Sequence, residues 1–347
     1  LAWSIARSKT RALSADTLLQ RSEGGPMSLL SLLLYIPLQV LFIPMAIVGV
    51  VLVAYKQMVV SKRLGVSQTA IEAINGRWTM HVFGMREDEA TASLAATLPN
   101  TSLLGLWLAL FPLWVKYKLS GEVFLYPRRV EEGSETLGEL VIARTLYFDR
   151  VIERVLGDVG QFVLLGAGYD TRAYGPFRRE GIVLFELDQE SVQDHKRIMT
   201  ARAGIDTADV RFVAVDFSED DVIEKLAEAG YDPAVKTIFL WEGVTLYLKE
   251  EAVRKTMRHV RTHSAPGSVL LADIYADRMI KMGKSAVGSK ALDYTNEGFG
   301  FGLPFSAGHE AALSRFVESE ALTVGETFFM GSASDKGPFM VVVEMVV

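Results

Sequence analysis

The sequence predicts an α/β fold, in which a mostly parallel sheet is covered by helices on both faces. Three observations predict it. Short apolar runs alternate with amphipathic helical patterns from about residue 130 onward. The first run ends in Gly166-Ala167-Gly168, which is typical of a tight loop after a buried strand. The chain then closes on two apolar runs with no helix between them, whereas the ordinary dinucleotide-binding fold ends on another strand–helix unit.

The hydrophobic periodicity assigns the elements of this sheet in order. We expect strands at 161–165, 182–187, 210–215, 236–241 and 268–274. The intervening helical patterns cover 134–156, 189–203, 218–229 and 249–263, and Pro266-Gly267 ends the last of them. The tail supplies two further strands, within 322–330 and 338–347, which we expect to form a hairpin-like close.

The N-terminal part has a different composition. No charged residue occurs from Gly24 to Tyr55, and a helix over residues 29–55 would be roughly 40 Å long, enough to span a bilayer. We interpret it as a membrane segment rather than a buried core helix. Pro37 and Pro44 would kink this helix or divide it into a re-entrant pair. Basic residues flank both ends, so the orientation is poorly specified.

Two other N-terminal stretches keep more than one interpretation. The chain begins at Leu1, which suggests a processed or partial product, and residues 1–21 are basic and serine-containing. They fit the remainder of an organelle-targeting segment or a basic flank beside a membrane. The apolar run 103–115 is too short to span, and fits an interfacial or re-entrant element, a lid, or core packing. We therefore divide the chain into a basic flank with a membrane segment (1–60), a helical or interfacial lid region (61–129) and a catalytic domain (130–347).

Composition excludes several classes of function. The net charge is −6, with about +5 in residues 1–63, so the rest is acidic and a nucleic-acid partner is disfavoured. The absence of cysteine excludes disulfides, thiolate metal sites and cysteine nucleophiles. His259 and His263 are the one histidine pair at ligand spacing, and we interpret them as a solvated helix face. No metal site is predicted.

Candidate ligand-binding residues follow four successive strands. In an open parallel sheet, ligands bind beyond the carboxyl ends of the strands. Gly166 and Gly168 follow the first strand, and Asp188 follows the second, at the spacing from the glycines where a carboxylate receives ribose hydroxyls. The pair Asp216-Phe217 follows the third strand and could bind and stack a base. Glu242 follows the fourth.

The glycine loop departs from the dinucleotide pattern. That pattern requires a third glycine at position 171, where a helix N-terminus receives a pyrophosphate, but this chain has Asp170-Thr171. A carboxylate at 170 would repel a pyrophosphate and suit a ligand with ammonium and sulfonium charges. An adenosine ligand with positive charge and no phosphates is S-adenosylmethionine. Arg144, one helix before the loop, could bind its carboxylate.

These motifs resemble a known family. The stretches LLGAGYDTR, FELD, Asp216-Phe217 and WEGVTLYL are similar to those of the leucine carboxyl methyltransferase family and its microbial O-methyltransferase relatives, over roughly residues 130–347. The resemblance implies a Rossmann-like, seven-stranded class I methyltransferase sheet with an antiparallel last strand. It also implies these contacts with S-adenosylmethionine: Arg144 with the methionine carboxylate, Gly166 with the methionine moiety, Asp188 with the ribose, Asp216 and Phe217 with the adenine, and Glu242 near the methionine ammonium. The membrane segment is not part of the family pattern, and residues 60–128 do not match its substrate-side residues.

Methyl transfer from a sulfonium mainly requires alignment and desolvation of the acceptor. A carboxylate acceptor needs no base, whereas a hydroxyl acceptor does, and His309 and Tyr247 are the candidate bases. His309 follows the Gly- and Phe-rich stretch 297–310, which could close over an apolar acceptor; it could equally be a surface loop residue, and Tyr247 could be a packing residue.

The sequence leads to one preferred hypothesis and two rivals. The preferred one is a membrane-anchored, S-adenosylmethionine-dependent O-methyltransferase, acting on a carboxylate or hydroxyl of a small-molecule, lipid-like or protein acceptor. Its catalytic domain would lie on the cytosolic or mitochondrial-matrix side. The first rival is an accessory subunit of a larger membrane complex, possessing the fold with little or no turnover. The second, a dinucleotide oxidoreductase, is disfavoured by Asp170 and Thr171.

Overall fold

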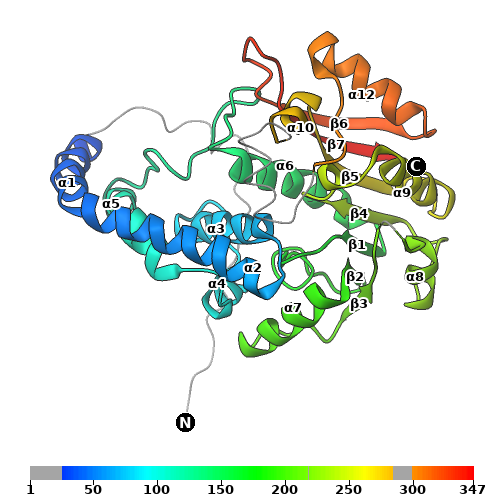
Figure 1. Ribbon diagram of the computed structural model, residues 1–347, viewed down its shortest axis with the longest axis horizontal. Coiled ribbons are helices and arrows are strands. Elements are labelled where there is room, and N and C mark those ends of the chain that lie inside the picture. Colours follow the sequence, from blue (N-terminus) through cyan, green and yellow to red (C-terminus); the bar gives the residue numbers. More distant parts are fainter. Residues whose placement is uncertain (1–25, 218, 284–298) are drawn as a thin grey trace.

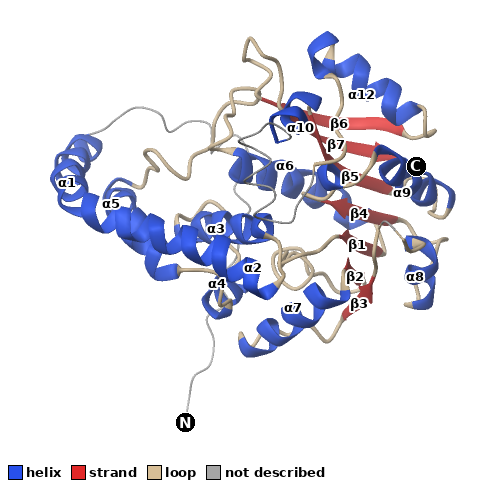
Figure 2. Cartoon of the chain, viewed as in Figure 1, coloured by secondary structure: helices blue, strands red, loops and turns tan. Residues whose placement is uncertain are grey.

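The protein is built around a seven-stranded sheet with the strand order β3-β2-β1-β4-β5-β7-β6 (Figure 1). The computed structural model describes residues 26–217, 219–283 and 299–347. Helices lie on both sides of the sheet, and a separate group of helices from the N-terminal third lies beside it (Figure 2). The basic flank 1–21 and part of the stretch 297–310 lie outside the described residues.

The strands confirm the sequence assignment. They are β1 (Gln161–Leu165), β2 (Val183–Asp188), β3 (Val210–Ala214), β4 (Thr237–Trp241), β5 (Val269–Tyr275), β6 (Thr323–Met330) and β7 (Met340–Val346). The first five pair in parallel, and β7 pairs antiparallel with both β5 and β6. This is the expected sheet with an antiparallel close. Every predicted strand of the parallel part lies within one residue of its observed ends.

The helices that accompany the sheet follow the predicted alternation. They are α6 (Leu140–Val155), α7 (Glu190–Arg202), α8 (Val222–Glu228), α9 (Glu250–Thr262), α10 (Asp277–Gly283) and α12 (His309–Glu318), with short 3-10 turns at Leu156–Asp158, Thr245–Tyr247 and Phe305–Ala307. The sequence did not predict α10 or α12. Both lie in the connection between β5 and β6, which the sequence presents as a glycine-rich stretch.

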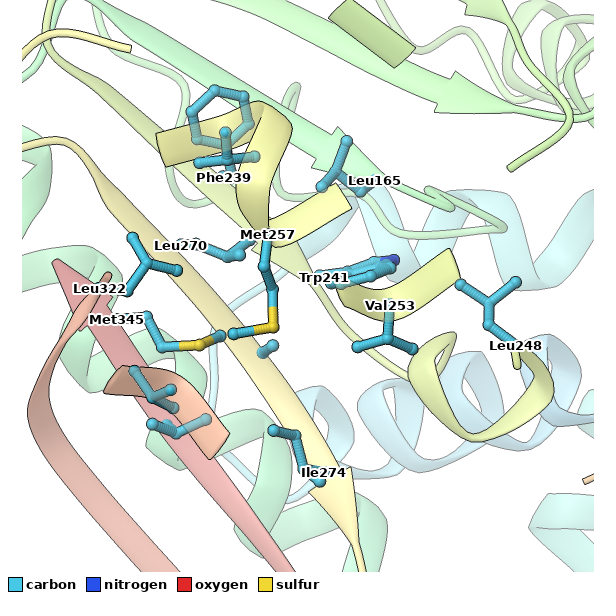
Figure 3. Close-up of a cluster of buried hydrophobic side chains, with 14 of the residues drawn as sticks. Leu165, Phe239, Trp241, Leu248, Val253, Met257, Leu270, Ile274, Leu322 and Met345 are labelled. Atoms are coloured by element: carbon cyan, nitrogen blue, oxygen red, sulfur yellow. The ribbon is translucent and has the colours of Figure 1, made fainter. Parts of the chain in front are cut away.

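Side-chain alternation along the strands builds a core on each face of the sheet. In β1, Val163 and Leu165 belong to one core, whereas Phe162 and Leu164 belong to the other. The first core is completed by α8, α9 and α12, and Figure 3 shows Met257 of α9 among strand residues of this core. The second is completed mainly by α6. Because both faces of the sheet are covered, the sequences of the strands are continuous apolar runs.

One long helical run precedes the domain. It consists of α1 (Pro26–Ala54), a π-helical turn (Tyr55–Val60) and α2 (Ser61–Leu64), and it ends at Gly65, whose φ is 66°. Pro37 and Pro44 lie inside α1 without dividing it, so the predicted re-entrant pair does not form. The described residues contain two helices long and apolar enough to cross a bilayer, Leu30–Leu64 with mean hydropathy 2.5 and Leu103–Ser120 with 1.2.

The second of these helices corrects the sequence assignment. Helix α5 runs from Leu103 to Ser120, past the apolar run that ends at residue 115, so it is not too short to span by length alone. The helix continues past Lys116, whose side chain is buried with its ammonium 4.9 Å from the centre of the Phe124 ring. Ser102 caps the start of the helix by accepting a hydrogen bond from the amide of Gly105.

Helix α5 packs along α1 and also contacts α3 (Gln68–Val82), and α4 (Glu89–Thr97) packs on α3 and α7. The Phe111 ring stacks on Phe42 of α1 with their centres 5.2 Å apart. One turn earlier in α5, Trp107 meets Trp78 of α3 edge-on at 5.6 Å. Helix α3 in turn packs against α6 of the sheet domain. The region 61–129 is thus helical, as expected, and it connects α1 to the domain.

Candidate active site

A cavity of about 680 Å³ lies at the carboxyl ends of β1, β2 and β4, within the size range of small-molecule sites. All eight residues that the sequence assigned to a cofactor line it: Arg144, Gly166, Gly168, Asp170, Asp188, Asp216, Phe217 and Glu242. The topology explains this convergence. Strand order reverses between β1 and β4, where the neighbouring connections leave on opposite faces of the sheet and open a crevice.

The glycine loop after β1 needs both of its glycines. Gly166 has a φ of 71°, and a Cβ there would lie 2.4 Å from a methyl group of Val244. Gly168 has a φ of 43°, and its amide donates a hydrogen bond of 2.6 Å to Asp188 Oδ2. The loop therefore turns tightly and leaves its backbone on the cavity wall, as a closely approaching ligand requires.

Asp188 ends β2 and fixes the loop. Its carboxylate accepts from the amides of Gly168 and Gln189, at 2.6 and 2.8 Å. These bonds use two of roughly four lone-pair sites, which leaves acceptor capacity for two ligand hydroxyls. Burial raises the pKa of Asp188 despite these two amide donors. The geometry suits the predicted ribose contact, which stays a prediction.

The adenine end is formed after β3. Asp216 is exposed, and Phe217 beside it is partly buried. The Phe217 ring lies 6.4 Å, centre to centre, from the ring of Trp241, which ends β4. The cavity thus has an aromatic side chain and a carboxylate at one end, which is the pair that a base with an exocyclic amine would use.

The acidic residue that replaces the third glycine does not present an isolated charge. Asp170 pairs with Arg77 at 2.9 Å and with Arg172 at 2.5 Å. Burial alone would raise the pKa of Asp170, but the charges of Arg172 and Arg77 outweigh it and hold the pKa far below its usual value. Asp170 is therefore an anion, as the sequence argument requires, but two guanidinium groups share its charge, and its contact with the ligand stays a prediction.

Glu242 belongs to the same buried network. Its carboxylate contacts Arg77 at 2.8 Å, Arg172 at 2.6 Å and Arg144 at 3.2 Å. Burial would raise its pKa, but Arg77, Arg172 and Arg144 together lower the pKa of Glu242 to about 2. The carboxylate is therefore charged at any physiological pH.

Arg144 joins this network to β5. It donates to Asp273 Oδ2 at 3.0 Å and to the hydroxyl of Tyr275 at 3.2 Å. Burial raises the pKa of Asp273 to about 6, although Arg144 and the Gly243 amide act in the opposite direction. The predicted binding of a methionine carboxylate by Arg144 stays a prediction, and it would require the guanidinium to exchange or share these partners.

The two candidate bases lie in different places. Tyr247 lines the cavity, and its hydroxyl donates to Thr69 Oγ1 at 3.1 Å. His309 does not line it. His309 begins α12, and its ring packs on Phe329 of β6 at 4.5 Å, at the other end of the sheet. The prediction that His309 faces an acceptor is wrong, because residues 309–318 form a helix on the face of β6 rather than a loop over the cavity.

The sequence missed Arg77, which is the main contribution of the N-terminal helices to the site. Arg77 is buried in α3 and reaches both Asp170 and Glu242 from a position 93 residues before the first of them. A signal existed: Arg77 lies in the stretch INGRWTM, where every other residue is apolar, small or uncharged. An arginine that is buried in such a setting requires a paired carboxylate.

Comparison with known proteins agrees with this geometry. The sequence pattern of the family described as leucine carboxyl methyltransferase matches residues 117–261. This match covers the motifs on which the resemblance to the family rests. The family segment contains α6, the glycine loop and the first four strands, which supply every residue of the cofactor prediction.

Curated relatives match about two fifths of the chain. A protein of Mycolicibacterium smegmatis, named as an S-adenosyl-L-methionine-dependent methyltransferase, is 39% identical over 147 residues, which are 42% of this chain and 49% of the relative. A Mycobacterium tuberculosis protein with the same kind of name is 34% identical over 147 residues, 42% of this chain and 46% of the relative. The chain spans about half the length of the curated relatives that it matches.

Solved structures are similar at low identity. An O-methyltransferase family protein from Burkholderia thailandensis has a TM-score of 0.41 and 17% identity, over 60% of this chain and 57% of that one. Magnesium protoporphyrin IX methyltransferase from Synechocystis has a TM-score of 0.39 and 12% identity, over 62% of this chain and 89% of that one.

Proposed function

We propose that the protein is an S-adenosylmethionine-dependent O-methyltransferase that acts at a membrane on an apolar acceptor. One observation carries the proposal: residues from four successive strand ends, together with Arg144, line a single cavity whose donor set fits this cosubstrate. The family relationship of residues 117–261 supports the same activity.

The residues fit the cosubstrate part by part. Asp188 would receive the ribose hydroxyls, and Asp216 with Phe217 would hold the adenine. Arg144 and Glu242, which are charged and face the cavity, would hold the carboxylate and the ammonium of the methionine part. When bound, S-adenosylmethionine supplies a methyl group on a sulfonium, so that a C–O bond forms to the acceptor while the C–S bond breaks and its electron pair stays on sulfur.

The chain's own residues favour a carboxylate acceptor over a hydroxyl. Of the two candidate bases only Tyr247 lines the cavity, and no histidine lines it among the described residues. A carboxylate attacks without losing a proton, so the protein would have to orient the acceptor and exclude water, with no base required. Tyr247 and Leu246 lie on the wall where an acceptor would pack.

Membrane attachment is the second part of the proposal. Large apolar side chains cover the outer surface of α1, and eleven of them between Leu33 and Val51 are about half exposed or more. A helix that is apolar around most of its circumference and not covered by protein is typical of a lipid-embedded segment. We infer that α1 attaches the protein to a bilayer, with the domain on the cytosolic or mitochondrial-matrix side.

A second candidate function has one observation in its favour. Glu242 and Arg144, which would bind the amino-acid part of the cosubstrate, contact each other at 3.2 Å, and Arg77 and Arg172 complete the network. Such internal pairing is what an accessory subunit of a membrane complex with little turnover would retain.

Isothermal titration calorimetry on the purified full-length protein in detergent tests the proposal. We expect binding of S-adenosylmethionine and S-adenosylhomocysteine and no binding of NAD(H). Binding of NAD(H) alone would overturn the methyltransferase proposal in favour of an oxidoreductase. If none of these ligands binds, the accessory-subunit hypothesis is favoured.

A further inference from the structure

One wall of the cavity is built from the chain that directly follows the apolar helix. The lining residues of this wall are Lys62, Gly65, Val66, Ser67, Thr69, Ala70, Glu72 and Ala73, so one basic and one acidic side chain border it. The last residue of the charge-free stretch is Tyr55, and Lys62 is seven residues further along a continuous helix. Seven residues of helix rise about 10 Å, so the cavity wall begins about 10 Å from the end of the charge-free surface.

Helix α1 lies along the protein rather than standing away from it (Figure 1). Its partner α5 is held against the α3 region at both ends, through Trp107 on Trp78 and through Tyr117 on Phe83, each pair with ring centres 5.6 Å apart. In Figure 1 the α2 end of this helical run is the end nearest to the sheet, so a bilayer that receives the exposed side of α1 comes closest to the domain there.

Charge at that end fits the lipid headgroup layer. Lys56, Lys62 and Arg63 follow the apolar stretch, and Lys56 donates to the carbonyl of Pro99 at 2.7 Å. Long basic side chains place their apolar stems in the membrane boundary and their charges among the headgroups. Since Lys62 also lines the cavity, the rim of the cavity lies at the level where the polar head of a membrane amphiphile would be.

Several cavity-lining side chains that the cosubstrate prediction does not use are apolar. They are Leu137, Leu140, Val141, Leu246, Met279 and Phe299. Leu137 among them is 51% exposed. This wall suits a hydrocarbon chain, and it is not needed to hold the adenosine or methionine parts of the cosubstrate.

We propose that the methyl acceptor is a long-chain carboxylic acid that enters the cavity directly from the bilayer, past the wall formed by residues 62–73. This proposal rests on the proposed function and specifies its acceptor. The acyl chain contacts the apolar wall, and Lys62 at the rim attracts the carboxylate from the headgroup layer. The carboxylate oxygen takes the methyl group, the sulfonium becomes a neutral thioether, and no proton is exchanged, which agrees with a cavity lacking histidine among the described residues.

Photo-crosslinking tests the route without depending on turnover. The full-length protein is reconstituted into phosphatidylcholine vesicles that contain palmitic acid with a mid-chain diazirine and a terminal alkyne. After irradiation, mass spectrometry locates the adducts. We expect adducts on segments 62–77 and 137–144 in addition to the outer surface of α1, and we expect excess unlabelled palmitate to suppress the adducts of the cavity segments selectively.

A plugged cavity and a matched control complete the test. Ala73→Trp should abolish the adducts on the cavity segments and leave those on α1, whereas Ala227→Trp, on the exposed side of α8, should change neither. Circular dichroism verifies folding, and Leu137→Trp replaces Ala73→Trp if that variant does not fold. Wild-type adducts confined to α1 and α5 would overturn the proposal. Calorimetry with S-adenosylhomocysteine distinguishes failure of this proposal from failure of the proposed function. If S-adenosylhomocysteine binds and no cavity adducts form, the lipid acceptor alone is refuted. If cavity adducts form and S-adenosylhomocysteine does not bind, the methyltransferase function is refuted.

Discussion

At the scale of single residues, Asp188 is the side chain with the clearest double role. It holds the glycine loop through the Gly168 amide and retains acceptor sites that face the cavity. We expect Asp188→Ala to weaken the binding of S-adenosylhomocysteine by ~1–3 kcal/mol, which is roughly 5- to 150-fold. Asp188→Asn should lose less, because it keeps one carbonyl acceptor. Calorimetry measures both, with Asp194→Ala on the exposed side of α7 as the control. Equal affinity of Asp188→Ala and wild type would exclude the ribose contact.

Glu242 gives a prediction about stability and pH. Its folded-state pKa of about 2 lies below the usual value of 4.5, so the stability that it contributes is present above pH 4.5 and is lost as the pH falls toward 2. Glu242→Gln should destabilise the ligand-free protein by ~3–5 kcal/mol at pH 7, since it removes a buried negative charge that Arg77, Arg144 and Arg172 share. Thermal melts from pH 7 downward should show this gap narrowing below pH 4.5. Glu228→Gln, which is exposed, should cost less than ~1 kcal/mol.

The contact between Arg144 and Glu242 determines which thermal-melt measurement can distinguish an enzyme from an accessory subunit. Because Arg144 and Glu242 are partners of each other, substituting either destabilises the ligand-free protein under both hypotheses. The stabilisation of wild type by S-adenosylmethionine is what differs, since only a binding protein gains stability from a ligand by mass action. A wild-type melting temperature that does not respond to saturating cosubstrate would support the accessory subunit.

The sequence predicted the cavity-lining residues correctly where the sheet topology brings them together. Gly166, Asp188, Asp216 and Glu242 each follow a parallel strand, and the carboxyl ends of parallel strands share one edge whatever the loops do. Prediction failed for Arg77, because its place beside Asp170 depends on how α3 packs against α6, and no local pattern encodes that packing.

At the scale of elements, two glycines fix the crossing of α1 and α5. A Cβ at Gly105 would lie 2.7 Å from the carbonyl oxygen of Gly49, and a Cβ at Gly49 would lie 2.5 Å from the carbonyl oxygen of Gly105. Helices of membrane proteins approach closely at such small residues. We expect Gly49→Leu to destabilise the detergent-solubilised protein by ~1–3 kcal/mol through overpacking.

Val50→Leu is the matched control, because Val50 is next in sequence and 59% exposed on the outer surface of α1. Thermal unfolding followed by circular dichroism should show a lower midpoint for Gly49→Leu and an unchanged one for Val50→Leu. Identical melts of the two variants would mean that α1 and α5 do not pack closely in the detergent-solubilised protein.

The boundaries of the parallel strands could be predicted because these strands are buried. The parallel strands are short apolar runs that end at polar or glycine residues, so their limits are sharp in the sequence. The end of α5 was not predictable from the sequence, because the charged Lys116 ends the apolar run. Only the structure shows that this side chain lies beside the Phe124 ring. Helix α12 was missed because the helix follows a glycine-rich stretch and is only ten residues long.

At the scale of the whole molecule, the N-terminal helices lie to one side of the sheet (Figure 2), and α1 carries the exposed apolar side chains. None of the described residues of α1 lines the cavity that Arg144 and Asp188 line. Membrane attachment and cosubstrate binding should therefore be separable by mutation.

The separating variant is Leu41→Glu/Val48→Glu/Val51→Glu, at positions that are 70%, 53% and 61% exposed. Each substitution removes about 1.5–3 kcal/mol of apolar burial in lipid and adds the cost of a charge there, so three together should abolish membrane binding. Because these side chains make little contact with the rest of the protein, the melting temperature and the affinity for S-adenosylhomocysteine should stay near the wild-type values. Flotation with phosphatidylcholine vesicles measures binding, and the corresponding triple alanine variant, which adds no charge, should still float. If the triple glutamate variant floats as wild type does, α1 is not the membrane anchor, and the route of an acceptor from the bilayer past residues 62–73 loses its basis.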